Sequence, residues 1–316
     1  MILVVGENVV DVLPDGQAVA GGGPANTAIA LTRLGIDCAF AARLGGDPYS
    51  RLIEARLSDA RLAPTFWVRT DEPSPVAQVS LDGTGGARYR FQLIGAADFN
   101  RKPGELPTGD RLSGIEAVHL GSLAAYLPPG ADVIEEWIAG IASRVLVSFD
   151  PNIRATVYRD LAEVRDRTER YSRFSHHIRA STDDLAALYG TEPVRVTATR
   201  WLDRGVRLVV ITNGRSVTAY HRDGELTLSA PKVTVVDTIG AGDSFTAGLL
   251  AWWRRTGALT ASGSAVDGGM VDRIVGQQPD DLRAAMEYAM AVAAINCTRR
   301  GADPPTHLEV EAFEFA

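Results

Sequence analysis

A glycine-rich turn that ends in an aspartate lies in the last quarter of the sequence, where residues 235–246 read VVDTIGAGDSFT. Gly240 and Gly242 allow backbone N–H groups to converge at the start of a predicted helix, Ser244–Arg254, and a helix start of this kind favours anions such as phosphate. Asp243 is expected at or near the N-cap of that helix. An N-cap aspartate would by itself stabilise the helix by about 1 kcal/mol, so an anion cradle and an ordinary cap both fit this stretch.

A second polar turn lies near the N-terminus, at Gly21-Gly22-Gly23-Pro24-Ala25-Asn26. Consecutive glycines permit positive φ angles and let a ligand approach the backbone closely. Asn26 projects an amide from the first turn of the following helix, and Asp11 follows the first predicted strand. Carboxylate, N–H and amide groups together suit sugar hydroxyls, which need both donors and acceptors. A tight turn with a polar cap is an equally good interpretation from spacing alone.

Two common nucleotide-binding fingerprints are missing from the sequence. The glycines at 21–23 have the wrong order for GxGxxG and do not directly follow the first predicted strand. No GxxxxGK[ST] run occurs, and Lys102 and Lys232 are the only lysines. The sequence therefore favours neither a nicotinamide-dependent oxidoreductase nor a P-loop protein.

Composition sets the broad class. The chain has 316 residues with 46% hydrophobic content, which suffices for one large domain or a domain with an elaboration. Its formal net charge of −7 argues against nucleic acid as a partner. No apolar run reaches the roughly 20 residues of a membrane span, and the N-terminus lacks a basic leader. We expect a cytoplasmic, soluble protein in which Cys38 and Cys297 are free thiols.

Short β-branched runs alternate with helical patterns along the chain, which predicts βαβ units and a mostly parallel sheet covered on both faces. The strand candidates are Ile2–Gly6, Ala39–Leu44, Ala117–Leu120, Val145–Phe149 and Leu208–Thr212. The helix candidates are Asn26–Leu34, Tyr49–Leu57, Val133–Ile141, Leu161–Tyr171, Asp184–Tyr189, Val196–Leu202 and a late amphipathic helix through Leu282 and Ala293.

Two stretches break this alternation and read as short strands: Asn8–Ala20, and Thr65–Phe91 with its FWVRT, PVAQVSLD and ARYRFQLI runs. They predict a small β lid. We expect residues 9–20 and 64–97 to form this lid and residues 1–8, 21–63 and 98–316 to form the α/β core. The lid would cover a site, join two copies in a homodimer, or do both, because exposed β edges invite pairing. Residues 260–278 are expected to form a surface loop.

The two glycine motifs, GGGPANTAIALTRLG and DTIGAGDSFTAG, resemble the signature motifs of the ribokinase-like (PfkB) carbohydrate kinases in order and separation. The segment Ser148–Arg154 resembles the DPNxR segment of fructokinase-like members, and residues 293–305 resemble the family's closing nucleotide-side helix and loop. The resemblance covers essentially the whole chain. It implies a three-layer α/β/α sandwich with a small β-sheet lid and ATP-dependent phosphorylation of a small sugar, with a hexose such as fructose as the expected acceptor. It also implies ATP and Mg²⁺ as cofactors and allows K⁺.

The resemblance assigns roles to individual positions. Asp243 matches the catalytic base, and the anion hole matches Gly240, Ala241 and Gly242. The implied sugar-binding residues are Asp11, Gly22, Gly23, Asn26, Arg90, Asn152 and Arg154. The implied nucleotide-binding residues are Asp184, Thr212, Gly214, Thr238, Gly240, Gly242 and Asn296. Asp184 is expected to support Mg²⁺ through water, and Asp237 lies where relatives often bind a monovalent cation.

Some positions depart from the family pattern and keep other acceptors open. Ser181-Thr182-Asp183-Asp184 stands where members often carry Asn-x-x-Glu. Leu93 stands where kinases of acid sugars and some fructose kinases commonly carry an arginine, which disfavours a carboxylate on the substrate unless Arg90 or Arg154 replaces it. Arg88 and Arg90 keep a sugar phosphate open. The alternatives are therefore a 2-keto-3-deoxy sugar acid, a nucleoside or a sugar phosphate, or a non-catalytic sugar or nucleotide sensor.

The position of Asp243 at a helix start also predicts its strength as a base. The helix dipole should keep the carboxylate ionised and therefore weakly basic. Proton transfer should then come late, as the phosphoryl group passes through a loose transition state. The backbone N–H groups of the turn would stabilise the charge on the phosphoryl oxygens.

Overall fold

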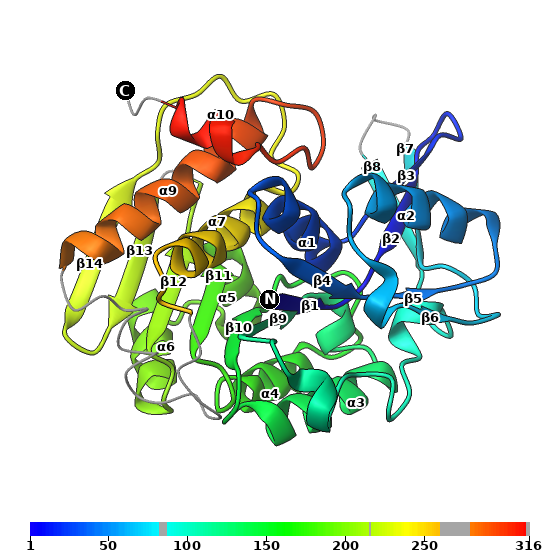
Figure 1. Cartoon of the computed structure of the whole chain (residues 1–316), viewed down its shortest axis with the longest axis horizontal. Helices are drawn as coiled ribbons and strands as arrows, with labels where there is room; N and C mark the ends of the chain where they lie inside the picture. Colours follow the sequence, from blue (N-terminus) through cyan, green and yellow to red (C-terminus); the bar gives the residue numbers. More distant parts are fainter. Residues whose placement is uncertain (82–86, 215, 260–278, 314–316) are drawn as a thin grey trace.

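A single large β-sheet forms the centre of the computed structural model, which describes residues 1–81, 87–214, 216–259 and 279–313 (Figure 1). The sheet has eight strands in the order β14-β13-β12-β11-β10-β9-β1-β4. The strands from β4 to β12 run parallel, whereas β13 and β14 form an antiparallel hairpin at the edge. The strand bounds are β1 Ile2–Val5, β4 Cys38–Ala41, β9 Ala117–Gly121, β10 Leu146–Asp150, β11 His177–Ser181, β12 Leu208–Thr212, β13 Ser216–His221 and β14 Gly224–Ser229. The predicted mostly parallel sheet is confirmed.

Helices cover both faces of this sheet (Figure 1). One face carries α1 Gly23–Arg33, α7 Ala241–Arg255 and α9 Pro279–Cys297, and the other carries α3 Gly130–Ile141, α4 Leu161–Tyr171, α5 Thr182–Tyr189 and α6 Val194–Asp203. The central strands are apolar on both sides, because alternate residues face opposite layers: Ile2 and Val4 join one buried cluster, and Leu3 and Val5 join the other. The three-layer α/β/α sandwich is confirmed. None of the described helices is long and apolar enough to cross a membrane.

Close packing of α7 against α9 fixes the helix that begins at the glycine-rich turn. A Cβ atom on Gly248 would lie 2.7 Å from the Cα atom of Ala289, so the two backbones approach at a point where only glycine fits. Trp253, further along α7, is buried with its ring against His177 of β11. The short helix α10, His307–Glu311, follows α9.

A separate four-stranded sheet, in the order β3-β2-β7-β8, lies beyond the β4 edge of the central sheet (Figure 1). Its strands are β2 Val9–Val12, β3 Ala18–Gly21, β7 Val76–Leu81 and β8 Ala87–Gln92, and α2 Pro48–Asp59 packs beside β3. The predicted small sheet is therefore present. The turn expected at Gly83–Gly86 and the loop expected at residues 260–278 lie outside the described residues.

Two expected strands differ from the structure. The run at residues 66–70 was expected in the small sheet, but its only strand residues, β6 Val68–Arg69, pair with β5 Arg43–Leu44. A 3-10 turn at Pro64–Phe66 takes up the preceding residues. The strand predicted at Ala39–Leu44 is accordingly split, because β4 stays in the central sheet while β5 leaves it. Other short 3-10 turns lie at Ala97–Phe99, Gly109–Leu112 and Leu123–Ala125.

Candidate active site

The polar groups singled out in the sequence gather at the carboxyl ends of the parallel strands, where α1 and α7 begin. Ligands of open α/β sheets commonly bind at such an edge. The clearest link is a hydrogen bond of 2.8 Å from the Asn26 side-chain amide to Oδ2 of Asp243, two residues that are 217 positions apart. The two glycine motifs therefore form one site.

The glycine-rich turn places Asp243 inside α7 rather than at its cap. Gly240 is the N-cap, in the left-handed conformation with φ of 74°, and the helix begins at Ala241. The expected N-cap position of Asp243 is therefore wrong. Its carboxylate makes no capping hydrogen bond, and within the described residues the N–H groups of Gly242 and Asp243 have no hydrogen-bond acceptor. These two donors, at the positive end of the helix, form a cradle for an anion.

One oxygen of the Asp243 carboxylate, Oδ1, lies close to Gly23 at the start of α1 and to the residues that follow β10. A Cβ atom on Gly23 would lie 3.2 Å from Oδ1 of Asp243, 2.7 Å from the Asn152 amide nitrogen and 3.7 Å from the Ser122 hydroxyl. Because Gly23 has no side chain, these three polar groups can approach its backbone closely. Since Asn26 holds Oδ2, Oδ1 is the oxygen that can receive a proton from an incoming hydroxyl.

Burial makes Asp243 a stronger base than the helix dipole alone would allow. Desolvation raises its pKa from 3.8 to about 7, with the Asp150 charge acting in the same direction and the Asn26 hydrogen bond, Arg154 and Arg179 opposing it. The expectation of a weakly basic carboxylate is therefore wrong, because desolvation outweighs the helix end and the nearby cations. A pKa near neutrality suits a general base.

Arg56 on α2 fixes the residue that holds this base. Its guanidinium donates a hydrogen bond of 2.7 Å to Oδ1 of Asn26, so the Asn26 amide is oriented by Arg56 on one side and by Asp243 on the other. Asn26 was expected among the sugar-binding residues, and its two contacts in the structure give it a positioning role as well. Sequence reasoning missed Arg56, because an arginine on an amphipathic helix is usually a solvated side chain.

A buried ion pair lies next to the site, at the ends of the central strands. Arg179 on β11 donates to Oδ2 of Asp150 at 3.0 Å and to the Thr212 hydroxyl at 2.5 Å, which joins the ends of three neighbouring strands. Burial raises the pKa of Asp150, and Arg179 opposes this shift. The Thr212 hydroxyl, expected to contact the nucleotide, is occupied by Arg179. Sequence reasoning missed Arg179, because its short strand also contains His177 and Ser181 and the arginine does not stand out there.

The acceptor side of the site contains most of the sugar-binding candidates. Gly22 has φ of 110°, and a Cβ atom there would lie 2.5 Å from the Glu7 carbonyl oxygen. Burial raises the pKa of Asp11, and the nearby Arg154 opposes this shift. Arg154 also lowers the pKa of Asp243 and of buried Glu7. Asn152 has φ of 42° and donates its N–H to Asp150.

Arg90 lies on β8 of the small sheet. It pairs with Gln78 on β7, and its side chain is exposed. Within the described residues no hydrogen bond or ion pair links Arg90 to Asp243 or Arg154. The nearby Leu93 is buried, and the Arg88 side chain lies outside the description.

The nucleotide-side candidates surround the same turn from the α9 end. The Asn296 amide donates to the Ile239 carbonyl at 2.8 Å, while its own Oδ1 is buried with no partner among the described residues. Asp237 accepts N–H groups from Ile239 at 3.0 Å and Gly301 at 2.8 Å, and these hydrogen bonds lower its pKa. Thr238 accepts the N–H of Ala241 at its carbonyl. An exposed apolar surface flanks this turn, formed by Val235, Val236 and Ile239.

Two candidate positions remain on this side. Gly214, after β12, has φ of 75°. Asp184 accepts the Ile153 N–H at 2.6 Å and forms a capping box with Ser181 at the start of α5. Both carboxylate oxygens of Asp184 are therefore already hydrogen-bonded to other groups of the protein. Among the described residues, no three Asp, Glu, His or Cys side chains are arranged to hold a metal ion.

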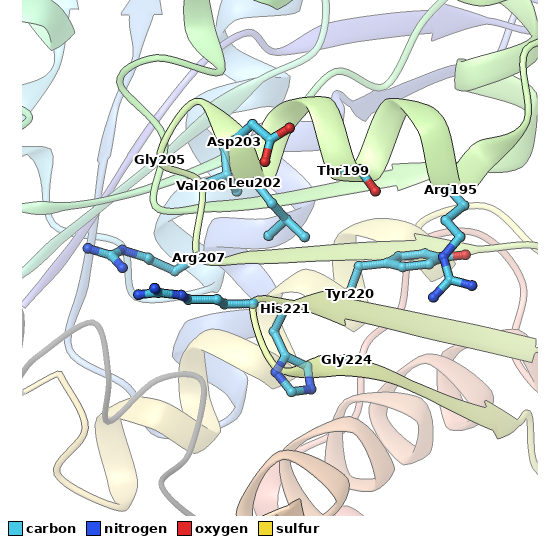
Figure 2. A pocket seen from close by; sticks show the side chains of 11 residues that line it. Arg195, Thr199, Leu202, Asp203, Gly205, Val206, Arg207, Tyr220, His221 and Gly224 are labelled. Carbon is cyan, nitrogen blue, oxygen red and sulfur yellow. The ribbon is translucent and has the colours of Figure 1, made fainter.

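Two hollows lie outside this cluster. One of about 430 Å³ is lined largely by apolar side chains, including Phe91, Leu93 and Tyr158. The other, of about 450 Å³, lies at the opposite end of β12. Figure 2 shows Arg195 of α6 above Tyr220 of β13 in this second hollow, which contains none of the candidate site residues.

Comparison with known proteins gives one consistent family. The sequence profile described as "pfkB family carbohydrate kinase" matches residues 2–308. The chain is 34% identical over 271 residues to a fructokinase of Rhizobium leguminosarum bv. trifolii, covering 82% of each protein. It superimposes on the crystal structure of a fructokinase from Xylella fastidiosa with bound ATP at a TM-score of 0.86 and 25% identity, covering 98% of this chain and 97% of that one. It also superimposes on a fructokinase double mutant from Vibrio cholerae O395, bound to fructose, ADP and a potassium ion, at a TM-score of 0.79 and 26% identity, covering 99% and 97%.

Proposed function

The chain belongs to the pfkB family of carbohydrate kinases and is an ATP-dependent sugar kinase, and we propose that its acceptor is fructose. The observation that carries the proposal is the Asp243 carboxylate, with Oδ2 held by Asn26 and Oδ1, close to Gly23, without a hydrogen-bond partner among the described residues. Two unpaired N–H groups of the same helix start lie next to it. A base and an anion cradle in one turn are the groups that transfer of a phosphoryl group to a hydroxyl requires.

The reaction uses these groups in sequence. The acceptor hydroxyl donates a hydrogen bond to Oδ1 of Asp243 and passes its proton there as its oxygen bonds to the γ-phosphorus of ATP and the bond to the leaving phosphate oxygen breaks. The N–H groups of Gly242 and Asp243 face the transferring group and stabilise the charge on its oxygens. Asn26 and Arg56 keep the carboxylate in position throughout.

The nucleotide and cations fit the other side of the turn. The exposed surface of Val235, Val236 and Ile239 offers a flat apolar contact for the adenine ring, and the unpartnered Oδ1 of Asn296 offers a buried acceptor beside Gly240. Mg²⁺ in such sites is held largely by substrate phosphates and water, with Asp184 as the proposed protein contact through water. We assign a K⁺ site near Asp237, in line with the potassium ion bound to the Vibrio cholerae fructokinase.

The small sheet is part of the proposal as a lid over the acceptor, comprising residues 9–20 and 64–97. Its edge strands β3 and β8 also offer pairing surfaces for a homodimer, which sedimentation velocity would detect. A monomer at all micromolar concentrations would exclude the dimer.

Cys38 and Cys297 are both free, which accords with a reducing cytoplasm.

An ADP-release assay across a panel of acceptors tests the acceptor class. The panel contains fructose, glucose, ribose, 2-keto-3-deoxygluconate, a nucleoside and fructose 6-phosphate, each with Mg²⁺ and with either K⁺ or Na⁺. We expect the highest kcat/KM for fructose. Leu93 at the end of the lid is apolar and offers no charge to an anionic acceptor, which leaves Arg154, near Asp11 and Asp243, as the cation on the acceptor side. A preference for fructose 6-phosphate or the sugar acid would contradict the proposal, and saturable sugar binding without turnover would identify a sensor.

A further inference from the structure

Arg179 lies directly beneath the turn that carries the base and the anion cradle. A Cβ atom built on Gly242 would lie 2.5 Å from Nη1, 3.0 Å from Cζ and 3.0 Å from Nη2 of Arg179. The guanidinium group therefore packs flat against the Gly242 backbone. Asp150 and Thr212 hold the same two nitrogen atoms, and only 8% of the residue is exposed. The position of this cation is thus fixed from both sides.

Helix stability does not explain a cation at this point. The first turn of a helix carries partial positive charge and favours anions, and burial of a charged group is unfavourable unless the group is paired. Arg179 stays charged because Asp150, Asp184 and Asp243 act on it, and together they raise its pKa against the effect of burial. Two positive groups, the helix start and the guanidinium, are therefore kept together in a buried place. An anion bound at the cradle would be attracted by both.

The identity of residue 242 supports the same interpretation. Gly240 needs glycine for its left-handed φ, but Gly242 has no φ in that range. Its lack of a side chain matters because any Cβ atom would overlap the Arg179 guanidinium. The absence of a side chain at Gly242 on α7 thus makes room for the guanidinium of Arg179 on β11.

We propose that Arg179 is a positioning residue for phosphoryl transfer: it places a fixed positive charge beneath the cradle and holds the Gly242 and Asp243 N–H groups toward the γ-phosphoryl group. This inference rests on the proposed phosphoryl transfer at the same turn. The charge of Arg179 acts on the transferring phosphoryl group through the helix start, and Arg179 itself takes part in no bond-making or proton-transfer step. Because the group carries more charge at its oxygens during transfer, the effect of Arg179 should be larger on kcat than on the KM for the sugar.

The test removes the charge without leaving its partner unpaired. The double variant Arg179→Met/Asp150→Asn replaces the ion pair by neutral groups, and Arg179→Lys keeps the charge. The control variant is Arg43→Met. It removes an equally buried arginine that lies outside the site and pairs with Glu72 and Glu105. We expect the double variant to lose about 100-fold in kcat, the lower range for loss of one electrostatic contact in a transition state, with less than about a threefold change in fructose KM. Arg179→Lys should recover at least about tenfold, and Arg43→Met should change thermal stability more than kcat.

A binding measurement makes the result independent of the sugar. Calorimetry with ADP and with a non-hydrolysable ATP analogue compares the site with and without a γ-phosphoryl group. The double variant should bind the analogue about tenfold more weakly and ADP nearly unchanged, which would support Arg179 even if fructose were the wrong acceptor. Gly242→Ala, which displaces the guanidinium while leaving its charge, gives a second route if the double variant does not fold, with the same split between the two ligands. Equal weakening of both ligands, wild-type kcat in the folded double variant, or no rescue by lysine would overturn the proposal.

Discussion

Replacement of Asp243 by asparagine tests the base and its unusual pKa in one variant. Asparagine keeps the size of the side chain and an oxygen that can accept the Asn26 amide, but it cannot take up a proton. Turnover should fall by at least about 100-fold, the lower range for loss of a general base. The same change removes a charge that burial makes unfavourable, so the variant should also be more stable than the wild type at neutral and higher pH.

The magnitude of the stabilisation follows from the pKa of the buried carboxylate. Folding raises that pKa from 3.8 to about 7, and each pH unit corresponds to about 1.4 kcal/mol, which gives an upper limit of about 4 kcal/mol. Asp243 is only half-buried, so we expect about 2 kcal/mol. On the scale of large domains this raises Tm by about 4 °C.

The sign of the pH dependence is fixed by the direction of the shift. A carboxyl group whose pKa is raised by folding contributes its full stability below about pH 4 and loses it as the pH rises through about 7. The wild type should therefore become less stable than Asp243→Asn as the pH rises from 4 to 7, and the two proteins should differ little in stability at the acid end. Thermal unfolding of both proteins without ligands, from pH 4 to pH 8.5, measures this window.

Asp237 supplies a control of opposite sign on the same turn. Hydrogen bonds from Ile239 and Gly301 lower its pKa, so Asp237→Asn should lower Tm at neutral pH, and the loss should shrink as the pH falls below about 4. A difference between Asp243→Asn and the wild type that is equal at pH 5 and pH 8 would refute burial as the source of the raised pKa. Near wild-type turnover on the preferred sugar would refute Asp243 as the base.

Three further perturbations follow from the geometry. The kcat/KM for the sugar should decline as the pH falls through about 7, because only ionised Asp243 accepts a proton, and a midpoint below pH 5 in steady-state kinetics would contradict the raised pKa. Arg56→Leu should lower kcat by about tenfold by releasing Asn26, with partial rescue by Arg56→Lys, whereas unchanged kinetics would mean that Asn26 orients the base alone. Gly248→Ala should destabilise the fold by about 1–3 kcal/mol in chemical unfolding, because its Cβ atom would meet Ala289 on α9, and an unchanged midpoint would show that the helices can separate without loss.

The sequence predicted the parts of the site that depend on local pattern. Buried parallel strands have a clear apolar signal, and glycine runs before helices mark turns, so the sheet and the two turns were found with small errors in helix starts. The turn at Gly240 illustrates the limit of this signal. Its left-handed conformation moves the cap back by three residues, and this is why Asp243 lies within the helix rather than at its cap.

The missed features depend on contacts between distant parts of the chain. Arg179 is one of several polar residues in a short strand, and only the folded sheet shows that Asp150 and Thr212 hold it beneath α7. Arg56 becomes part of the site only because the fold brings this residue of α2 within hydrogen-bond distance of Asn26 on α1. The pKa of Asp243 is set by how closely the protein surrounds it, which no residue pattern encodes. Local dipoles could be inferred from sequence, whereas desolvation could not.

The glycines of the site differ in the physical reason that excludes a side chain. Gly240 requires a left-handed backbone, Gly23 lets polar side chains including Asp243 approach the start of α1, and Gly242 allows a guanidinium to pack against the helix start. Only the first reason concerns flexibility. The other two concern volume, since Gly23 lies next to Oδ1 of Asp243 and Gly242 lies next to the buried cation. Alanine at Gly23 should therefore weaken sugar binding, and alanine at Gly242 should slow phosphoryl transfer. Alanine at Gly240 should distort the turn itself. The three substitutions therefore separate functions that the glycine-rich motifs combine.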